Sequence, residues 1–197
     1  MPTDDRTLLR KTHAGHEPAA RELWQRHAGW MLAYARTILG NRGSLSPEDV
    51  VQSVFCRLLA LDRRVIRNVR EVRPWLAQLI RREALNQRRT ARRATQRDAR
   101  THRPAQTVEP TPSTDDLARA MAQLPRPLRE VTHLRHIAGL STDQTAQVLD
   151  IPRGTVASRC HAAKRELRGM LNLTEPSTPS TPTPPNPLGA PRHVFAD

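Results

Sequence analysis

One stretch near the end of the chain carries side chains suited to contacting a polyanion. From Gly154 to Leu171, hydroxyl, imidazole and cationic groups recur on one side of a predicted helix. They are Thr155, Ser158, Arg159, His161, Lys164 and Arg165. Such groups suit phosphate oxygens and the acceptors on base edges in the major groove of DNA. The opposite side is an apolar stripe with helical spacing, which we expect to be buried. It consists of Val156, Cys160, Ala163, Leu167 and Met170.

A second, shorter helix is predicted immediately before this one. Ser141 and Gln144 have the spacing of a capping box, in which each side chain bonds a backbone N–H at the helix start. Asp150 tolerates the left-handed backbone that ends a helix, and Pro152 suits the beginning of the next. The pattern predicts a helix-turn-helix. The alternative, an amphipathic surface helix whose charges only face water, is less favoured because of the capped preceding helix and the turn.

Composition indicates nucleic acid as a partner. The chain of 197 residues has 32 Lys and Arg against 19 Asp and Glu, a net charge of +13. No apolar run approaches the roughly 20 residues that span a bilayer, and the first residues lack the apolar core of a secretion signal, so we expect a cytoplasmic protein. Cys56 and Cys160 have no neighbours at metal spacing, and clustered carboxylates are absent. We therefore expect no metal, no cofactor and no enzymatic activity.

The first half of the chain predicts three longer helices. The first runs from Ala19 to Leu39, the second starts at the Ser46 cap, and the third starts near Pro74. The residues expected to face inward are Leu23, His27, Trp30, Met31, Tyr34 and Ile38 in the first, Val50, Val51, Val54, Phe55, Leu58 and Leu59 in the second, and Trp75, Leu76, Leu79, Ile80 and Leu85 in the third. Because all aromatic residues except Phe195 lie in this half, we expect the two halves to have different cores.

Two exposed surfaces of these helices bear on function. The outer face of the second helix is partly acidic, with Asp49, Gln52 and Ser53, and is either a solvated face or a docking patch for a protein. The third helix ends in a basic ridge that we expect to follow a DNA backbone. The ridge comprises Arg81, Arg82, Arg88, Arg89, Arg92 and Arg93. Residues 61–73 predict a basic loop or a short helical turn.

The overall prediction is an all-α protein of two small helical domains on a tether. We place an N-terminal segment at residues 1–18, a first domain at 19–93, a flexible basic linker at 94–112, a helix-turn-helix domain at 113–173 and a disordered tail rich in Pro and Thr at 174–197. In the second domain, Ser113 is expected to cap a helix, and Pro125 to Pro127 separates it from the next. Their inward residues are expected to be Leu117, Ala120, Met121 and Leu124, then Leu128, Val131, Leu134 and Ile137.

Two blocks of the sequence together resemble the extracytoplasmic-function (ECF) sigma factors of bacterial RNA polymerase, which contain only regions 2 and 4. LWQRHAGWMLAYARTILG, SPEDVVQSVFCRLL and RPWLAQLIRREALNQRRTARR resemble region 2. QLPRPLREVTHLRHIAGLSTDQTAQVLDIPRGTVASRCHAAKREL resembles region 4. The resemblance implies a factor that binds core polymerase, recognises the −10 and −35 promoter elements and initiates transcription. It also adds an anti-sigma factor to the candidate partners.

The resemblance assigns roles to individual residues. Asp49, Gln52 and Ser53 become the candidate core-binding residues. The candidate −10 residues are Arg63, Arg64, Arg67, Asn68, Arg81, Arg82, Asn86, Arg88 and Arg89. The candidate −35 residues are Thr155, Ala157, Ser158, Arg159, His161, Lys164 and Arg165.

The sequence also departs from the family pattern. Ser53 stands where many relatives have an acid, and Arg82 and Asn86 stand at the usual Asn and Asp. Ala157 and Ala162 replace residues that are often basic, so the promoter sequence is beyond prediction. The alternative function is a helix-turn-helix regulator that binds DNA without polymerase.

Overall fold

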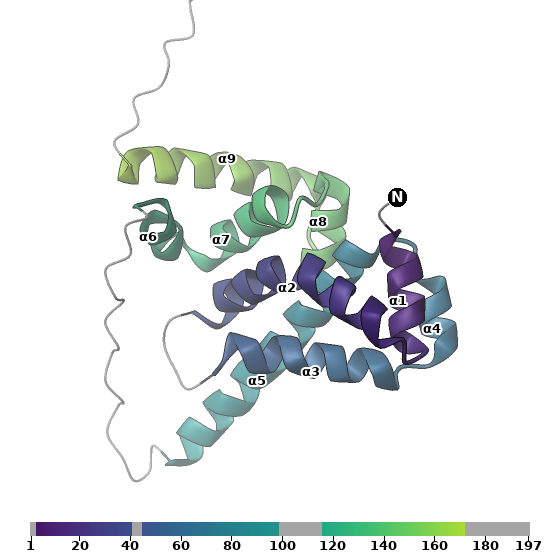
Figure 1. Ribbon diagram of the computed structural model, residues 1–197. Coiled ribbons are helices and arrows are strands. Elements are labelled where there is room, and N and C mark those ends of the chain that lie inside the picture. Colours follow the sequence, from purple (N-terminus) through teal and green to yellow (C-terminus); the bar gives the residue numbers. More distant parts are fainter. Residues whose placement is uncertain (1–2, 41–44, 99–115, 172–197) are drawn as a thin grey trace, which may run out of the picture.

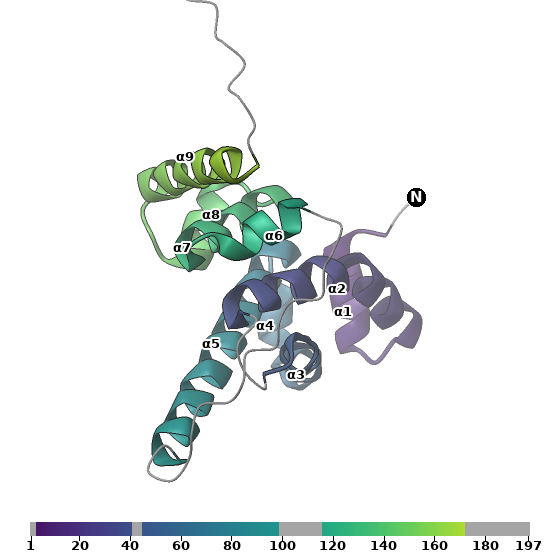
Figure 2. The same ribbon diagram turned by 90° about the vertical axis from the view of Figure 1, so that its left-hand side faces the viewer.

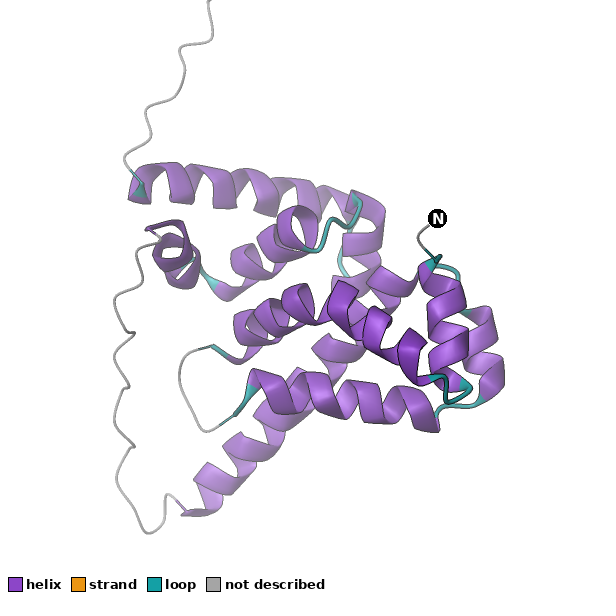
Figure 3. Ribbon diagram, viewed as in Figure 1, coloured by secondary structure: helices purple, strands orange, loops and turns teal. Residues whose placement is uncertain are grey.

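The computed structural model describes residues 3–40, 45–98 and 116–171, and every regular element within them is a helix (Figure 1, Figure 3). The first half contains α1 (Asp5–His13), α2 (Glu17–Leu39), α3 (Pro47–Ala60), α4 (Arg63–Asn68) and α5 (Val72–Asp98). The second half contains α6 (Asp116–Gln123), α7 (Arg126–Thr132), the π-helical turn η1 (His133–Ile137), α8 (Thr142–Leu149) and α9 (Arg153–Met170). The predicted all-α class is confirmed. The proposed Ser113 cap and the tail from 174 lie outside the described residues.

Side-chain caps set several helix starts as the sequence predicts. Ser46 Oγ accepts the Asp49 N–H at 3.2 Å, which begins α3. Ser141 and Gln144 form both bonds of the capping box at the start of α8. Asp150, which ends α8, has a φ of 56° in the left-handed region. The turn between α8 and α9 therefore forms as predicted.

Helix α2 is the centre of the first half, packed against α1, α3 and α5. Its predicted inward side from Leu23 to Ile38 is buried. The N-terminal segment joins this core, because Leu8 and Leu9 of α1 are also buried. Helix α5 continues to Asp98 and so enters the predicted linker. Its last turns carry mostly polar residues, so apolar periodicity could not place its end.

Four residues predicted to face inward are exposed. Leu59, Leu117, Ile137 and Met170 retain between 38% and 55% of their accessible surface. Each lies near one end of its helical segment, where the predicted apolar side extends beyond the neighbouring helices. The buried part of the α9 stripe is consequently short, with Val156 and Ala163 buried and Cys160 half-buried.

The prediction of different cores for the two halves is wrong, because one cluster of buried side chains runs through both. Helix α7 and η1 pack against α2, and α8 packs against α5 (Figure 2). Aliphatic residues of the second half, among them Val131, Leu134 and Leu140, are part of the same cluster as Tyr34 and Leu76. The scarcity of aromatic residues in the second half therefore reflects its composition and does not indicate a separate core.

Gly139 lies at the junction between η1 and α8, against the start of α5. Its φ is +68°, and a Cβ built there would lie 3.3 Å from Arg73 Nη1. The same Arg73 nitrogen donates to the backbone carbonyl of Ala138 at 3.2 Å. Glycine thus permits both the left-handed backbone and the close approach of the arginine.

Candidate nucleic-acid interface

The predicted −35 residues lie along α9, on the side of the molecule farthest from α3 (Figure 1, Figure 2). Exposed members are Ala157, Ser158, His161, Lys164 and Arg165, while Thr155 and Arg159 are half-buried. Val156 and Ala163, on the opposite side of α9, are buried, and α9 packs against α7 and α8. The helix therefore presents its donors and cations to solvent.

Local contacts hold the start of α9 relative to α8. Arg153 Nε lies 3.2 Å from Asp143 Oδ1, which links the first turns of the two helices. Ser158 Oγ donates to the Thr155 carbonyl at 3.1 Å, so this hydroxyl is partly engaged within α9. The arrangement is a helix-turn-helix whose second helix is exposed along its basic side.

The predicted −10 residues are divided between α4 and α5. Those on α4, Arg63, Arg64 and Arg67 with Asn68, are all exposed. The α4 helix starts at Asp62, whose Oδ1 accepts the Arg64 backbone N–H at 2.6 Å. On α5, the side chains of Arg82, Asn86 and Arg89 are exposed. These residues of α4 and α5 are therefore accessible in the described arrangement.

Two other predicted −10 residues are engaged inside the protein. Arg81 Nε lies 3.3 Å from Oε2 of Glu130, a buried carboxylate of α7 whose Oε1 lies 2.6 Å from Arg126 Nε. Arg88 donates to the backbone carbonyl of Ile38 at 3.0 Å, near the end of α2, and its partial burial lowers its pKa. Arg81 therefore joins the two halves, and Arg88 ties α5 to α2.

A buried histidine makes a further polar contact between the halves. The His133 ring stacks on Tyr34 with a centroid separation of 5.3 Å, and its Nε2 lies 3.0 Å from the Trp30 carbonyl oxygen. Because a carbonyl only accepts, Nε2 carries the hydrogen. Burial lowers the pKa of His133 to about 4, so the ring is neutral near pH 7. No sequence pattern marked this histidine as an interdomain contact.

The predicted docking face lies on α3. Asp49 and Gln52 are exposed and Ser53 is half-buried. Asp49 occupies the first turn, where a carboxylate is favoured by the positive end of the helix dipole. The face is thus available to a partner.

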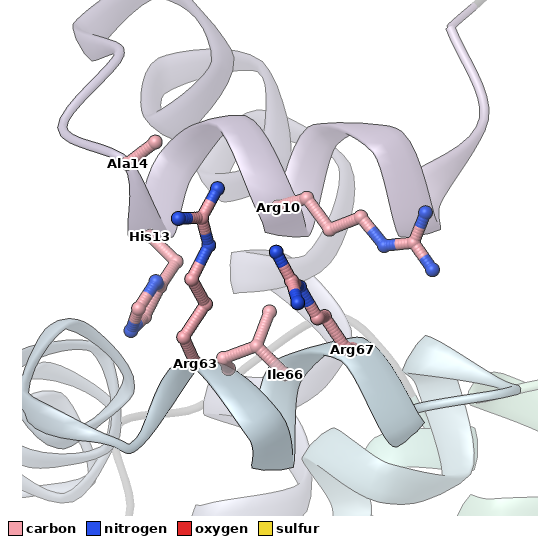
Figure 4. A pocket seen from close by; sticks show the side chains of 6 residues that line it. All are labelled: Arg10, His13, Ala14, Arg63, Ile66 and Arg67. Atoms are coloured by element: carbon pink, nitrogen blue, oxygen red, sulfur yellow. The ribbon is translucent and has the colours of Figure 1, made fainter.

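The structure adds a basic hollow that the sequence did not indicate. It lies between α1 and α4 and brings Arg10 and His13 next to Arg63 and Arg67 (Figure 4). Leu8, Leu9 and Thr12 are buried on the opposite side of α1. Their helical spacing in the sequence is the signal that could have identified Arg10 as an outward residue.

Two further classes of feature were searched in the described part of the chain. Across residues 3–40, 45–98 and 116–171, no group of three or more His, Cys, Asp or Glu side chains could hold a metal ion. None of the helices in those ranges is long and apolar enough to cross a membrane.

Family models match both halves of the chain. Residues 23–94 match the family described as "Sigma-70 region 2", and residues 114–167 match "Sigma-70, region 4". The first match includes α3, α4 and most of α5, and the second includes the helix-turn-helix.

A curated relative is more specific. "ECF RNA polymerase sigma factor SigL" of Mycobacterium tuberculosis is 33% identical over 158 residues, covering 75% of this chain and 86% of the relative. The chain therefore belongs to the ECF sigma factors of RNA polymerase, as the sequence blocks predicted.

Two solved structures have a similar fold. The sigma factor RpoE of Bartonella quintana, crystallised with the anti-sigma factor NepR, matches with a TM-score of 0.62 at 21% identity, covering 78% of this chain and 96% of RpoE. CnrH, solved with the cytosolic domain of CnrY, matches with a TM-score of 0.56 at 25% identity, covering 85% and 97% respectively.

Proposed function

We propose that this chain binds core RNA polymerase, recognises the −10 and −35 elements of a promoter and initiates transcription in the cytoplasm. The observation that carries the proposal is the presence, in one member of the ECF family, of exposed basic residues on α4 and α5, a separate basic side of α9 and an exposed, partly acidic face on α3. The three surfaces correspond to the two promoter elements and to the polymerase.

The −35 element is assigned to α9. Arg159, Lys164 and Arg165 supply cations, and Thr155, Ser158 and His161 supply further hydrogen-bonding groups on the same helix. Arginine binds guanine O6 and N7 in a bidentate manner, while lysine binds phosphates as a point charge. Ala157, exposed among these residues, has only a methyl group to offer a thymine methyl.

The −10 element is assigned to α4 and α5. Arg63, Arg64, Arg67, Arg82 and Arg89 are exposed cations for backbone phosphates. Asn68 and Asn86 can donate and accept at base edges. Strand separation on this surface would be sustained by unstacked bases held in pockets, each compensating a few kcal/mol of unpairing.

Two tethered DNA contacts reinforce each other, because the second becomes intramolecular once the first is made. In the described arrangement Arg81 is paired with Glu130 of α7. A contact between Arg81 and DNA therefore requires the two halves to separate at this point. Separation would also let each half reach its own promoter element. Arg88, bonded within the first half, would retain its contact with Ile38 when the halves separate.

Core polymerase is assigned to the α3 face, with Asp49, Gln52 and Ser53 as the contacting residues. An anti-sigma factor is included among the proposed partners, since the sigma factor RpoE was solved with one. An anti-sigma factor would act by covering one of the three surfaces.

The test is run-off transcription with core polymerase on a library of random promoters. We expect RNA from holoenzyme made with this chain and none from core alone. Absence of RNA on every template, with the chain folded and bound to core, would refute the proposal. Tight binding of the chain alone to a DNA site, without any effect of core, would instead favour a polymerase-independent regulator.

The docking assignment is tested by Asp49→Arg. We expect loss of co-purification with core, because charge reversal places a cation on the proposed contact. Glu17→Arg is the matched control, since Glu17 is also a first-turn acid but lies on α2. Equal retention of core by both variants would remove α3 from the interface.

A further inference from the structure

A second hollow lies at the junction of the two halves, between α5, α7 and the helix-turn-helix. Its volume is about 300 Å³. The polar part of its lining consists of Arg81 of α5, Arg126 and Glu130 of α7 and Arg159 of α9, and its apolar part includes Leu149 and Ile151. Because its walls come from both halves, a molecule bound in this junction hollow would contact both.

Cations outnumber acids in the junction hollow. Its three arginines carry three positive charges against the single negative charge of Glu130, an excess of two. Glu130 is buried and the arginines are half-buried, so water and salt screen these charges less than on an open surface. Two arginines just outside the hollow show the consequence. Burial lowers the pKa of Arg88 and of Arg129, and the charge of Arg126 lowers both further, despite the opposing effect of Glu130.

Glu130 engages only one nitrogen of each arginine that it contacts. Its Oε2 lies 3.3 Å from Arg81 Nε, and its Oε1 lies 2.6 Å from Arg126 Nε. A guanidinium has five N–H donors, so four remain on each of these arginines. Within the described residues those donors make no hydrogen bond, and neither does the Arg159 guanidinium. Arg153, on the same helix as Arg159, differs because it forms an ion pair. The hollow therefore has unused donors from both halves.

The chemistry of the lining indicates a phosphate group as the ligand. Guanidinium groups match the geometry of phosphate oxygens, and a phosphate monoester carries a charge of about −1.5 to −2 at pH 7. That charge is close to the excess in the hollow, whereas each phosphodiester of DNA carries only one negative charge. The volume lies at the lower end of the range of about 300–1,000 Å³ found for ligand pockets, so a small molecule fits better than a polymer.

We propose that Arg81, Arg126 and Arg159 bind a small phosphate dianion, which holds the two halves of the chain together. An anion that binds only the described arrangement of the halves stabilises that arrangement by mass action. The consequence for transcription rests on the proposed function. Arg81 and Arg159 are candidate residues for the −10 and −35 elements, so an anion that engages both would lower the affinity of the chain for a promoter.

The experiment follows thermal unfolding of the full chain while inorganic phosphate replaces chloride at constant ionic strength. We expect a saturable rise of the midpoint. Arg126→Gln tests the site, because Arg126 has no proposed role in binding DNA. It should weaken the apparent phosphate affinity about tenfold, the share of the charge-assisted hydrogen bonds of one guanidinium. Arg26→Gln is the matched control, since Arg26 is also half-buried and paired with carboxylates but lies outside the hollow. It should leave the phosphate response unchanged.

Amide hydrogen exchange tests whether the anion holds the halves together. Saturating phosphate should slow exchange in α5 and α7 of the wild type and not in Arg126→Gln. Unchanged exchange in the wild type would overturn the closing role. A DNA duplex at the same phosphate concentration should not slow exchange at these helices, and an equal effect of the duplex would overturn the assignment to a small anion.

The remaining outcomes separate the site from a general ion effect and from the proposed function. Equal phosphate responses of Arg126→Gln and Arg26→Gln, or a rise without saturation, would overturn the proposal. If circular dichroism shows that Arg126→Gln is unfolded, Arg159→Gln replaces it, because Arg159 has no internal partner among the described residues. Run-off transcription by the wild type is measured in parallel without phosphate. Absence of RNA would refute the sigma factor proposal and leave phosphate binding standing, and absence of a phosphate response would do the reverse.

Discussion

The two basic surfaces differ in how their arginines are held. On α9 most of the predicted DNA-binding side chains are exposed, and buried contacts are confined to the opposite side. On α5, Arg81 is paired with a buried carboxylate of the other half, and Arg88 bonds the backbone of α2. The basic side of α9 is therefore already accessible, whereas part of the predicted −10 surface also holds the fold together.

Because of this difference, Arg81 has two roles: it stabilises the contact between the halves, and it is predicted to bind DNA. A DNA phosphate that recruits Arg81 must compete with Glu130, a carboxylate that remains buried with Arg126. Binding at α9 has no such competitor among the described contacts of its exposed residues. Contact with the −35 element is thus expected to precede full contact with the −10 element.

The largest expected effect comes from removing the carboxylate that distinguishes the two surfaces. Glu130→Ala should lower the free energy of unfolding by about 3 kcal/mol, because it leaves two partly buried arginines unpaired. Urea denaturation of the full chain measures this. Glu48→Ala is the matched control, since Glu48 pairs with Arg36 at an exposed site and should change stability little. Equal midpoints for the two variants would show that Glu130 does not join the halves.

The buried histidine at the same junction predicts a pH dependence. His133 has an ordinary pKa of 6.5 that burial lowers to about 4, so the unfolded chain binds more protons between these values. Stability should fall as pH drops from 6.5 toward 4, by up to about 3 kcal/mol, and this contribution should stop changing below that window.

His133→Phe isolates that dependence because a phenyl ring can still stack on Tyr34 but cannot be protonated. Burial also lowers the pKa of His27 and His136, and both contribute equally to the wild type and the variant. The wild type should therefore lose more stability than the variant between pH 6.5 and 4. Parallel curves from chemical denaturation at each pH would exclude His133 as the source.

On the basic side of α9, effects should appear in DNA binding and not in folding. Arg159→Ala should cost about 1–3 kcal/mol of binding and relax the choice of base at one −35 position, if it reads a guanine. Lys164→Gln should weaken all sequences alike and reduce the salt slope by about 0.9. Footprinting of holoenzyme on a promoter selected by run-off distinguishes the two, and identical base preferences for Arg159→Ala and wild type would remove Arg159 from direct readout.

The smallest effect concerns the positioning of α9. Ser141→Ala removes half of the capping box at the start of α8 and should cost about 1 kcal/mol of stability. Thermal unfolding followed by circular dichroism measures it. Ser158→Ala, which loses only a bond to a carbonyl within α9, should shift the midpoint less. The reverse order would mean that the capping box does not stabilise the helix-turn-helix.

The sequence predicted the parts of the fold that depend on local rules. The caps at Ser46 and Ser141, the left-handed Asp150 and the buried side of α2 follow from helix geometry and short-range hydrogen bonds. The exposed side of α9 followed from the same periodicity. The comparisons confirm the family resemblance. The sequence blocks that carry this resemblance include the same caps and the same buried side of α2.

Contacts between distant parts of the chain were not predictable in this way. His133, Glu130 and Arg81 are polar residues that local pattern assigns to the surface, yet they meet at the junction of the halves. Arg10 likewise approaches α4 only because α1 folds back on the first half. Such pairings depend on how the helices pack together, and the spacing of residues along one helix does not predict that packing. The roles of individual residues in binding polymerase and DNA remain predictions.

Gly139 shows that solvent exposure is a poor guide to which positions tolerate mutation. A side chain there would cost about 1–2 kcal/mol for the left-handed backbone alone. The Arg73 guanidinium that bonds Ala138 would also have to shift by a few tenths of an ångström. In a saturation survey of the chain, this exposed glycine should tolerate replacement less well than exposed residues with an ordinary helical backbone.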